Sequence, residues 1–252
     1  MVRRGSPLDF TSSFSMFDLF AVQYERYRQT AIRGGLAPER VLTLGSARYC
    51  PEWQEINQRL ISGNNYSIPE SSDTRLRVVF MDYPDGYRIH SDRVGTAMGA
   101  LADMPGITLV VKPATRGNHL SAAKFPESAV ITTTIPSLAL CQWADVVIGT
   151  TSSILLQPLI EGKTMLYPRY FHENTMLFDE MGACWTVDSL EEMIAAIEKL
   201  SDDPGFRPYT DEAVQAFLDY VTKGGDPNRD VLGDYVKVIQ GSIDRTREPV
   251  ST

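Results

Sequence analysis

Cysteine and histidine are scarce in this sequence, with three residues of each among 252. Cys50, Cys141 and Cys184 lie far apart, which indicates reduced core thiols rather than a disulfide framework or a metal knuckle. The histidines, at positions 90, 119 and 172, are too scattered to form a metal site. We therefore expect no metal and no cofactor, and a cytoplasmic location.

Long apolar runs and basic stripes are also missing. No apolar run approaches the roughly 20 residues that span a bilayer, and the first ten residues, MVRRGSPLDF, lack the apolar stretch of a signal peptide. Any membrane contact is therefore expected to be peripheral, at the inner membrane. Acidic residues outnumber Lys and Arg by 32 to 24, and the resulting net charge of −8 argues against nucleic acid as a partner.

Four catalytic motifs are absent as well. The sequence contains no G-x-G-x-x-G, no G-x-x-x-x-G-K-[ST], no H-E-x-x-H and no G-x-S-x-G. Their absence argues against a dinucleotide oxidoreductase, a P-loop protein, a zinc protease and a serine hydrolase.

From residue 76 onward, short β-rich runs alternate with helical stretches, which is the pattern of a parallel sheet covered by helices on both faces. The predicted strands span residues 76–81, 107–111, 129–132, 145–148, 164–167 and 184–187. The predicted helices span residues 92–104, 137–143, 152–161 and 189–200, and the last begins with a capping-box spacing. The expected fold class is thus α/β, with a Rossmann-like parallel sheet.

The flanking segments predict the domain organisation. A helix over 17–34, a strand over 40–44 and a helix over 51–60 indicate the remnant of an N-terminal domain, residues 1–62. The polar segment 63–75 is the expected linker. Residues 76–243 form the predicted nucleotide-binding domain with C-terminal helices over 211–222 and 231–241, and residues 244–252 form a tail.

The most informative segment is DVVIGTTSSILLQPLIEGK, residues 145–163. An apolar strand ends at Gly149, and the hydroxyl residues Thr150, Thr151, Ser152 and Ser153 lead into a helix. A helix N-terminus carries roughly half a positive charge and free N–H groups, so this turn suits a phosphate. An ordinary N-cap fits the spacing equally well, while the position at a strand's carboxyl end favours a ligand site.

A second strand end carries cations. Lys112 and Arg116 follow the strand over 107–111, and His119 lies just beyond them. Arg116 suits bidentate phosphate recognition, and Lys112 suits a point charge. From this segment alone, solvent-exposed loop cations are favoured over a phosphate site, because most surface cations are weakly paired.

Three further residues are candidates. Asp82 and Tyr83 come immediately after the strand over 76–81, in a segment that also has the composition of a tight turn. Glu161 lies about two turns into the predicted helix, where it either points to the same mouth of the sheet or is a solvated residue before a Gly162 cap. The aromatic segment 167–174 either lines a base or sugar pocket or packs on the core.

These segments resemble the C-terminal, donor-binding domain of GT-B-type transferases that build bacterial capsule and other surface polysaccharides. Residues 45–49, GSARY, are similar to the "G-S-x-R-[FY]" end of the N-terminal domain in that group. Residues 112–116, KPATR, are similar to its "K-P-H-[PT]-R" element, and residues 149–163 to its "S-S … E-G-K" element. The resemblance covers nearly the whole chain.

In Kdo transferases, sialyltransferase-like enzymes and CDP-glycerol glycerophosphotransferases, these elements hold the phosphates of the nucleotide donor. The resemblance therefore implies a nucleotide-sugar donor and a glycan acceptor as partners. It implies donor contacts from Lys112, Arg116, Thr151, Ser152 and Ser153, with Glu161 as a ribose contact.

Two features depart from this family pattern. Ala114 stands where such families usually place a histidine. Either phosphate binding depends on Arg116 and the helix after Ser152, or this copy has lost activity. In addition, only about 75 residues precede the sheet, against roughly 100–150 in a full domain, so we expect either that the chain is a fragment or that a partner chain supplies the N-terminal half.

The leading hypothesis is a glycosyltransferase, or its donor-binding half, that transfers a sugar from a nucleotide donor such as CMP-Kdo to a surface polysaccharide. The nearest alternative is a CDP-glycerol or polyol-phosphate transferase, and a sugar-nucleotide 2-epimerase is more distant. From another class comes a non-catalytic nucleotide-binding or scaffold domain, which Ala114 and the short N-terminus favour. No catalytic base is identifiable in the sequence.

Overall fold

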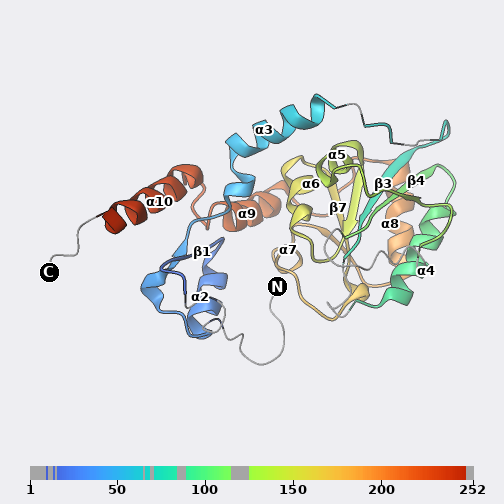
Figure 1. Ribbon diagram of the computed structural model, residues 1–252. Helices are drawn as coiled ribbons and strands as arrows, with labels where there is room; N and C mark the ends of the chain where they lie inside the picture. Colours follow the sequence, from blue (N-terminus) through green and yellow to red (C-terminus); the bar gives the residue numbers. More distant parts are fainter. Residues whose placement is uncertain are drawn as a thin grey trace. The chain divides into compact units, whose positions relative to one another are not determined.

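The computed structural model describes residues 10, 14, 16–64, 66–68, 71–83, 89–114 and 125–247, and it divides the chain into two compact units (Figure 1). The sheet unit contains the described residues of 61–215. The terminal unit contains the described residues up to 60 and those from 216 onward. The boundary at 60/61 lies close to the predicted one at residue 62. The C-terminal helices, which we placed in the nucleotide-binding domain of residues 76–243, belong instead with the N-terminal segment from residue 216.

The sheet unit is built on six parallel strands in the spatial order β5-β4-β3-β6-β7-β8. This arrangement confirms the predicted Rossmann-like α/β class, and the six predicted runs coincide with the six strands to within two residues. In chain order, the strands are β3 (Leu76–Met81), β4 (Ile107–Lys112), β5 (Val130–Ile131), β6 (Val146–Gly149), β7 (Thr164–Pro168) and β8 (Trp185–Val187).

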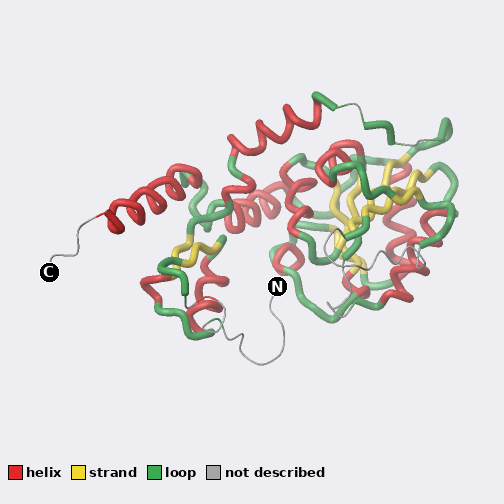
Figure 2. The backbone as a smooth tube through the Cα atoms, viewed as in Figure 1, coloured by secondary structure: helices red, strands yellow, loops and turns green. Residues whose placement is uncertain are grey.

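Helices cover both faces of this sheet (Figure 2). Val78 and Val79 are adjacent in β3 and both fully buried, which is typical of a parallel strand covered on its two faces. On one face, Val78 packs with Met98 of α4 and Ile197 of α8. The helices of this unit include α4 (Ser91–Ala102), α5 (Ser137–Trp143), α6 (Leu156–Ile160), α7 (Leu177–Glu180) and α8 (Leu190–Asp202).

The predicted helix over 152–161 is shorter and less regular than expected. Residues Ser153–Leu155 form a 3₁₀ turn, and only Leu156–Ile160 are α-helical. Pro158 has no N–H to donate to the carbonyl of Ile154, so it fits only in the first turn of an α-helix. By contrast, α8 begins as predicted, with the Ser189 Oγ accepting from the Glu192 N–H at 3.2 Å.

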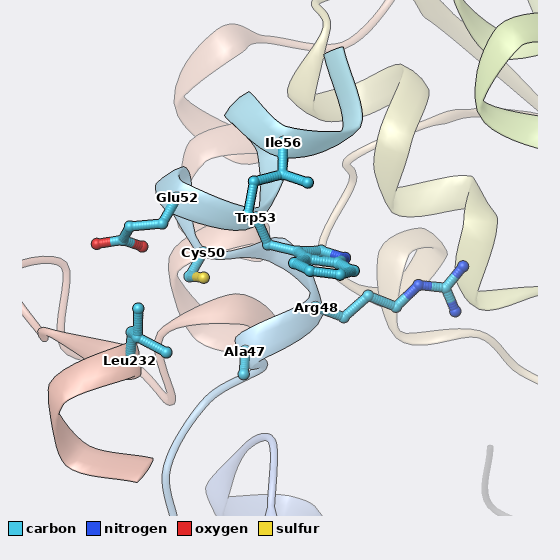
Figure 3. A pocket seen from close by; sticks show the side chains of 7 residues that line it. All are labelled: Ala47, Arg48, Cys50, Glu52, Trp53, Ile56 and Leu232. Carbon is cyan, nitrogen blue, oxygen red and sulfur yellow. The ribbon is translucent and has the colours of Figure 1, made fainter. Parts of the chain in front are cut away.

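The terminal unit contains a small β–α–β motif, in which β1 (Phe20–Val22) pairs in parallel with β2 (Val41–Thr43). The prediction of a helix over 17–34 was wrong at its start, because residues 20–22 are the extended partner of β2 and α2 spans only Glu25–Arg33. Near β2, α3 (Pro51–Ser62) and α10 (Val231–Arg247) contribute apolar side chains to a pocket of about 720 Å³ (Figure 3).

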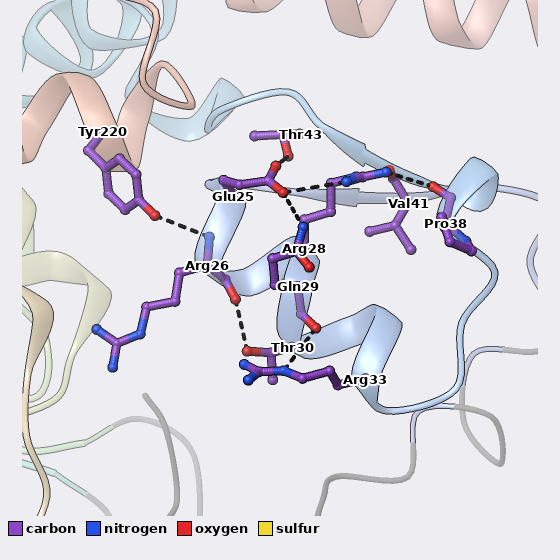
Figure 4. A network of polar contacts seen from close by, with 10 residues as sticks. All are labelled: Glu25, Arg26, Arg28, Gln29, Thr30, Arg33, Pro38, Val41, Thr43 and Tyr220. Atoms are coloured by element: carbon purple, nitrogen blue, oxygen red, sulfur yellow. Dashed lines mark hydrogen bonds and ion pairs between the residues drawn. The ribbon is translucent and has the colours of Figure 1, made fainter.

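Polar contacts fasten α2 to β2 (Figure 4). The Arg28 guanidinium donates to the carbonyls of Val41 at 2.9 Å and Pro38 at 3.0 Å. Glu25, in the first turn of α2, accepts from the Thr43 hydroxyl at 3.3 Å. Tyr220 of α9 (Asp211–Thr222) accepts from the Arg26 N–H at 3.1 Å, so the C-terminal segment contacts this motif directly.

The C-terminal segment packs against the N-terminal segment through a close backbone contact at Gly45. The Ser46 N–H donates to the Thr222 carbonyl at 2.7 Å, and the Tyr235 hydroxyl donates to the Gly45 carbonyl at 3.2 Å. Gly45 has a φ of +78°, and a Cβ there would lie 2.3 Å from the Thr222 oxygen. Only glycine fits this approach.

In the sheet unit, the buried His172 links the segment that follows β7 to Tyr167 of that strand. The Asn174 N–H donates to the Nδ1 of His172 at 3.0 Å, so the other ring nitrogen, 3.1 Å from the Tyr167 hydroxyl, carries the proton. Burial lowers the pKa of His172 to about 4, and the neighbouring His90 adds to the effect. The neutral ring is therefore the form that the fold stabilises.

Gly45→Ala is expected to destabilise the terminal unit by more than about 3 kcal/mol, because it combines a positive φ with a backbone clash. Gly162→Ala is the matched control: Gly162 has a φ of +67°, but a Cβ there would meet no atom of the described residues within 4 Å, so only the conformational cost of about 1–2 kcal/mol remains. Urea unfolding of both variants measures the difference. Equal losses would contradict the close contact with Thr222.

The free energy of unfolding is expected to fall as the pH drops from 6.5 toward 4, because the unfolded chain protonates His172 in this range while the folded chain does not. The loss attributable to this group is at most about 1.4 kcal/mol per pH unit. His172→Gln should make the free energy of unfolding nearly independent of pH above pH 5. His90→Gln should keep most of the pH dependence. Denaturant unfolding at a series of pH values is the measurement; an unchanged slope in His172→Gln rules out this residue as the cause.

Candidate functional site

The register of the sheet brings three of the predicted segments to one edge. Met81, the last residue of β3, aligns with Lys112 on one side and with Gly149 on the other. Neighbouring strands lie about 4.8 Å apart, so the three strand ends are side by side. The chain proceeds from β3 to β4 in one direction and from β6 to β7 in the other, which makes this the switch point where open α/β sheets bind ligands.

The Gly149–Ser153 turn follows β6 at this carboxyl edge of the sheet, which we call the mouth. A Cβ at Gly149 would lie 2.6 Å from a methyl of Leu155, so the glycine lets the turn pack against the helix that follows. Ser152 is the N-cap, and its hydroxyl accepts from the Ile154 N–H at 3.4 Å. The Thr151 hydroxyl is buried and has no hydrogen-bond partner among the described residues. The N-cap interpretation therefore holds for Ser152, while Thr151 retains hydrogen-bonding capacity for a ligand.

Lys112 ends β4, on the other side of β3. Its side chain is only 6% exposed, and its ammonium donates to the Thr133 carbonyl at 2.9 Å. Within the part of the chain that the structure describes, no carboxylate forms an ion pair with it. Burial lowers the pKa of Lys112, because a cation with little solvent is destabilised. An ammonium with three donors and one carbonyl partner is suited to bind an anion.

Asp82 and Tyr83 come immediately after β3, the strand between β4 and β6, and both are partly buried. The Asp82 N–H donates to the Lys112 carbonyl at 2.9 Å, which extends the ladder between β3 and β4 to the mouth. The predicted contacts Arg116 and His119 lie outside the described residues. Ala114 is described and is partly buried two residues past Lys112.

Glu161 is not brought to this mouth. It is the C-cap residue of α6, and β7 begins three residues later, at Thr164. Glu161 therefore lies toward the amino edge of the parallel sheet. Its carboxylate accepts from the Gln157 side chain at 2.8 Å, and burial raises its pKa. Lys163 donates to the carbonyls of Gln142 and, at 2.6 Å, Ala144, at the end of α5. The Glu161–Lys163 segment thus joins α6, α5 and β7 at the edge opposite the mouth.

The aromatic segment after β7 belongs to the core rather than to a base or sugar pocket. Tyr167 and Phe171 are fully buried, and Phe171 packs edge-on against Phe80 of β3. Arg169 is held by Asp188, with the Nε donating at 2.7 Å. Neither hydropathy nor spacing distinguishes these alternatives, since both place aromatic residues after a strand.

The described residues include no group of three or more His, Cys, Asp or Glu side chains arranged to hold a metal ion. No helix in the described ranges is long and apolar enough to cross a bilayer.

Comparison with known proteins gives matches only at the level of structure. No family model and no curated protein matches the sequence. The UDP-GlcNAc 2-epimerase of Methanocaldococcus jannaschii aligns with 89% of this chain at 12% identity and a TM-score of 0.58. The wall teichoic acid polymerase TagF aligns with 93% at 13% identity and 0.52, and the calicheamicin glycosyltransferase CalG4 with 90% at 16% identity and 0.50.

These similarities show a shared fold. The chain spans 61%, 60% and 55% of the epimerase, TagF and CalG4 chains, respectively. The identities of 12–16% are too low to carry over an activity. The chain thus has the Rossmann-like α/β fold that is also found in a glycosyltransferase, a wall teichoic acid polymerase and a UDP-GlcNAc 2-epimerase.

Proposed function

We propose that this chain is a glycosyltransferase of GT-B type, or the donor-binding part of one, and that the mouth between β3 and β6 binds the phosphates of a nucleotide-activated donor. The observation that carries this proposal is the alignment of Lys112 with the Gly149–Ser153 turn across Met81. A buried cation and a buried hydroxyl without a hydrogen-bond partner among the described residues then belong to strand ends that meet at the same switch point, which supports the proposal.

The proposed chemistry is electrostatic. The Lys112 ammonium and the N–H groups at the start of the 3₁₀ turn stabilise negative charge on the phosphate that leaves the sugar. The Thr151 hydroxyl donates a further hydrogen bond, and Thr150 and Ser153 complete the turn around the phosphate. Arg116 is proposed as an additional phosphate contact from its place four residues past Lys112.

The donor is proposed to be a cytidine nucleotide such as CMP-Kdo, with a bacterial surface polysaccharide as acceptor. A CDP-glycerol or polyol-phosphate transferase is the second candidate, and the fold shared with a wall teichoic acid polymerase supports it. The acceptor site and catalytic base are proposed to lie on a further domain or a partner chain. The enzyme is proposed to work in the cytoplasm, at the inner membrane surface.

Calorimetric titration of the chain with CMP, CDP, UMP and UDP tests donor binding. We expect a cytidine nucleotide to bind, and Lys112→Met to weaken its affinity about tenfold or more, because a charge-assisted hydrogen bond contributes about 1.5–3 kcal/mol. Thr151→Val should weaken binding by a smaller factor.

Lys163→Met is the matched control, since Lys163 is a half-buried lysine at the opposite edge whose loss should lower stability without changing affinity. Absence of binding by any nucleotide at about 1 mM would refute the proposal. An equal loss of affinity in Lys112→Met and Lys163→Met would place the effect in the fold rather than in the mouth.

Ala114→His tests whether this chain lacks a phosphate ligand. If position 114 is the missing contact, the variant should bind the preferred nucleotide at least several-fold more tightly, with the gain larger at pH 6 than at pH 8 because the protonated imidazole is the better anion ligand. The same titrations measure this. A pH-independent affinity equal to that of the parent chain would show that the alanine at position 114 does not weaken nucleotide binding.

A further inference from the structure

Helix α10 carries two neighbouring apolar stripes in the terminal unit. One stripe packs on its own unit: Val231 is 5% exposed, and the Tyr235 hydroxyl donates to the Gly45 carbonyl. The other stripe is displaced by one residue along the helix and faces solvent. It consists of Leu232, Val236, Ile239 and Ile243, whose exposed fractions run from 39% to 56%.

The spacing of the exposed stripe is that of a helix-pairing seam. Its members are separated by four, three and four residues, the a/d repeat of a coiled coil. In this repeat, the β-branched Val236 and Ile243 occupy a positions, and Leu232 and Ile239 occupy d positions. A seam of this kind stabilises a helix only when it packs against a second helix.

The seam continues into the apolar pocket beside it. Leu232 begins the seam and also lines the pocket, opposite Trp53 and Ile56 of α3 (Figure 3). Trp53 is 44% exposed and Ile56 is 38% exposed. The unit therefore presents one continuous apolar surface, formed by α10 and the first turns of α3.

The charges on α10 favour a second copy of the same helix as the occupant. Of the charged residues of α10, Asp234, Lys237 and Asp244 occupy the outward b and f positions of the repeat, and Arg245 and Arg247 come after the last residue of the seam. The positions that flank the seam contain no charge in its described part: Gly233, Tyr235, Gln240 and Ser242. Two copies can therefore pack without like-charge repulsion at the seam.

An anionic lipid surface is a poorer match. Interfacial helices that bind such surfaces have a polar face rich in Lys and Arg. Helix α10 instead carries both signs of charge, with Asp234 and Asp244 among Lys237, Arg245 and Arg247, and the chain as a whole has a net charge of −8.

We propose that the chain forms a symmetric dimer in which α10 packs antiparallel along α10 of a second copy. Antiparallel packing pairs Ile243 of one copy with Leu232 of the other and Val236 with Ile239. The C-terminal half of each helix then covers the pocket beside Trp53 of the partner copy. It also places the two helix dipoles in the favourable, opposite orientation.

Sedimentation velocity over about 1–100 µM protein tests the dimer. The full chain should sediment as a dimer at the upper concentrations, and Ile239→Glu should raise the dissociation constant at least 100-fold. Lys237→Glu is the matched control on the same helix, with its side chain 75% exposed at an outward position, and should change the constant less than threefold. Circular dichroism of both variants confirms that the helix is retained.

Ile239→Ala provides a second variant that leaves helix propensity high and should weaken the dimer by a smaller factor. Trp53→Ala should also weaken it, because antiparallel packing places this side chain against the partner's helix. A monomeric parent chain at about 100 µM, or a dimer that Ile239→Glu leaves intact, overturns the proposal. Loss of the dimer in Ile239→Glu with no effect of Trp53→Ala overturns the antiparallel arrangement.

Discussion

The hydrogen-bond ladder of β3, with β4 on one side and β6 on the other, is the constraint on which the candidate site depends. Through this ladder, Lys112 and Gly149 flank Met81 although 37 residues separate them in the sequence. Because the central strands β3, β4, β6 and β7 are largely buried on both faces, a shift of register would break the close packing of their side chains against the helices that cover the sheet. The same burial that stabilises the sheet therefore fixes the geometry of the mouth.

Much of this sheet is predictable from the sequence, because strands buried on both faces are continuous apolar runs. Residues 76–81 show this directly, since the predicted and observed bounds of β3 agree. The three residues of β1 are too few for a periodic signal, so pairing with β2 decided their conformation. The carbonyl of Thr222, which joins the C-terminal segment to Ser46, leaves no trace in hydropathy.

The site was predictable only in part for related reasons. A residue after a parallel strand lies at the carboxyl edge, so Lys112 and the Gly149–Ser153 turn could be assigned to one mouth. Glu161 was misplaced because the spacing of a helix gives no direction by itself. Its proximity to β7 is the signal that identifies the amino edge. The buried state of Lys112 and its single carbonyl partner follow from packing and required the structure.

The central claim concerns where a donor phosphate binds, and a crystal structure of the chain with CDP tests it most directly. The account predicts a phosphate oxygen within about 3 Å of the Lys112 ammonium and in hydrogen-bond contact with the Thr151 hydroxyl, at the carboxyl ends of β3, β4 and β6. A nucleotide bound at the amino edge of the sheet, beside Lys163, would contradict it.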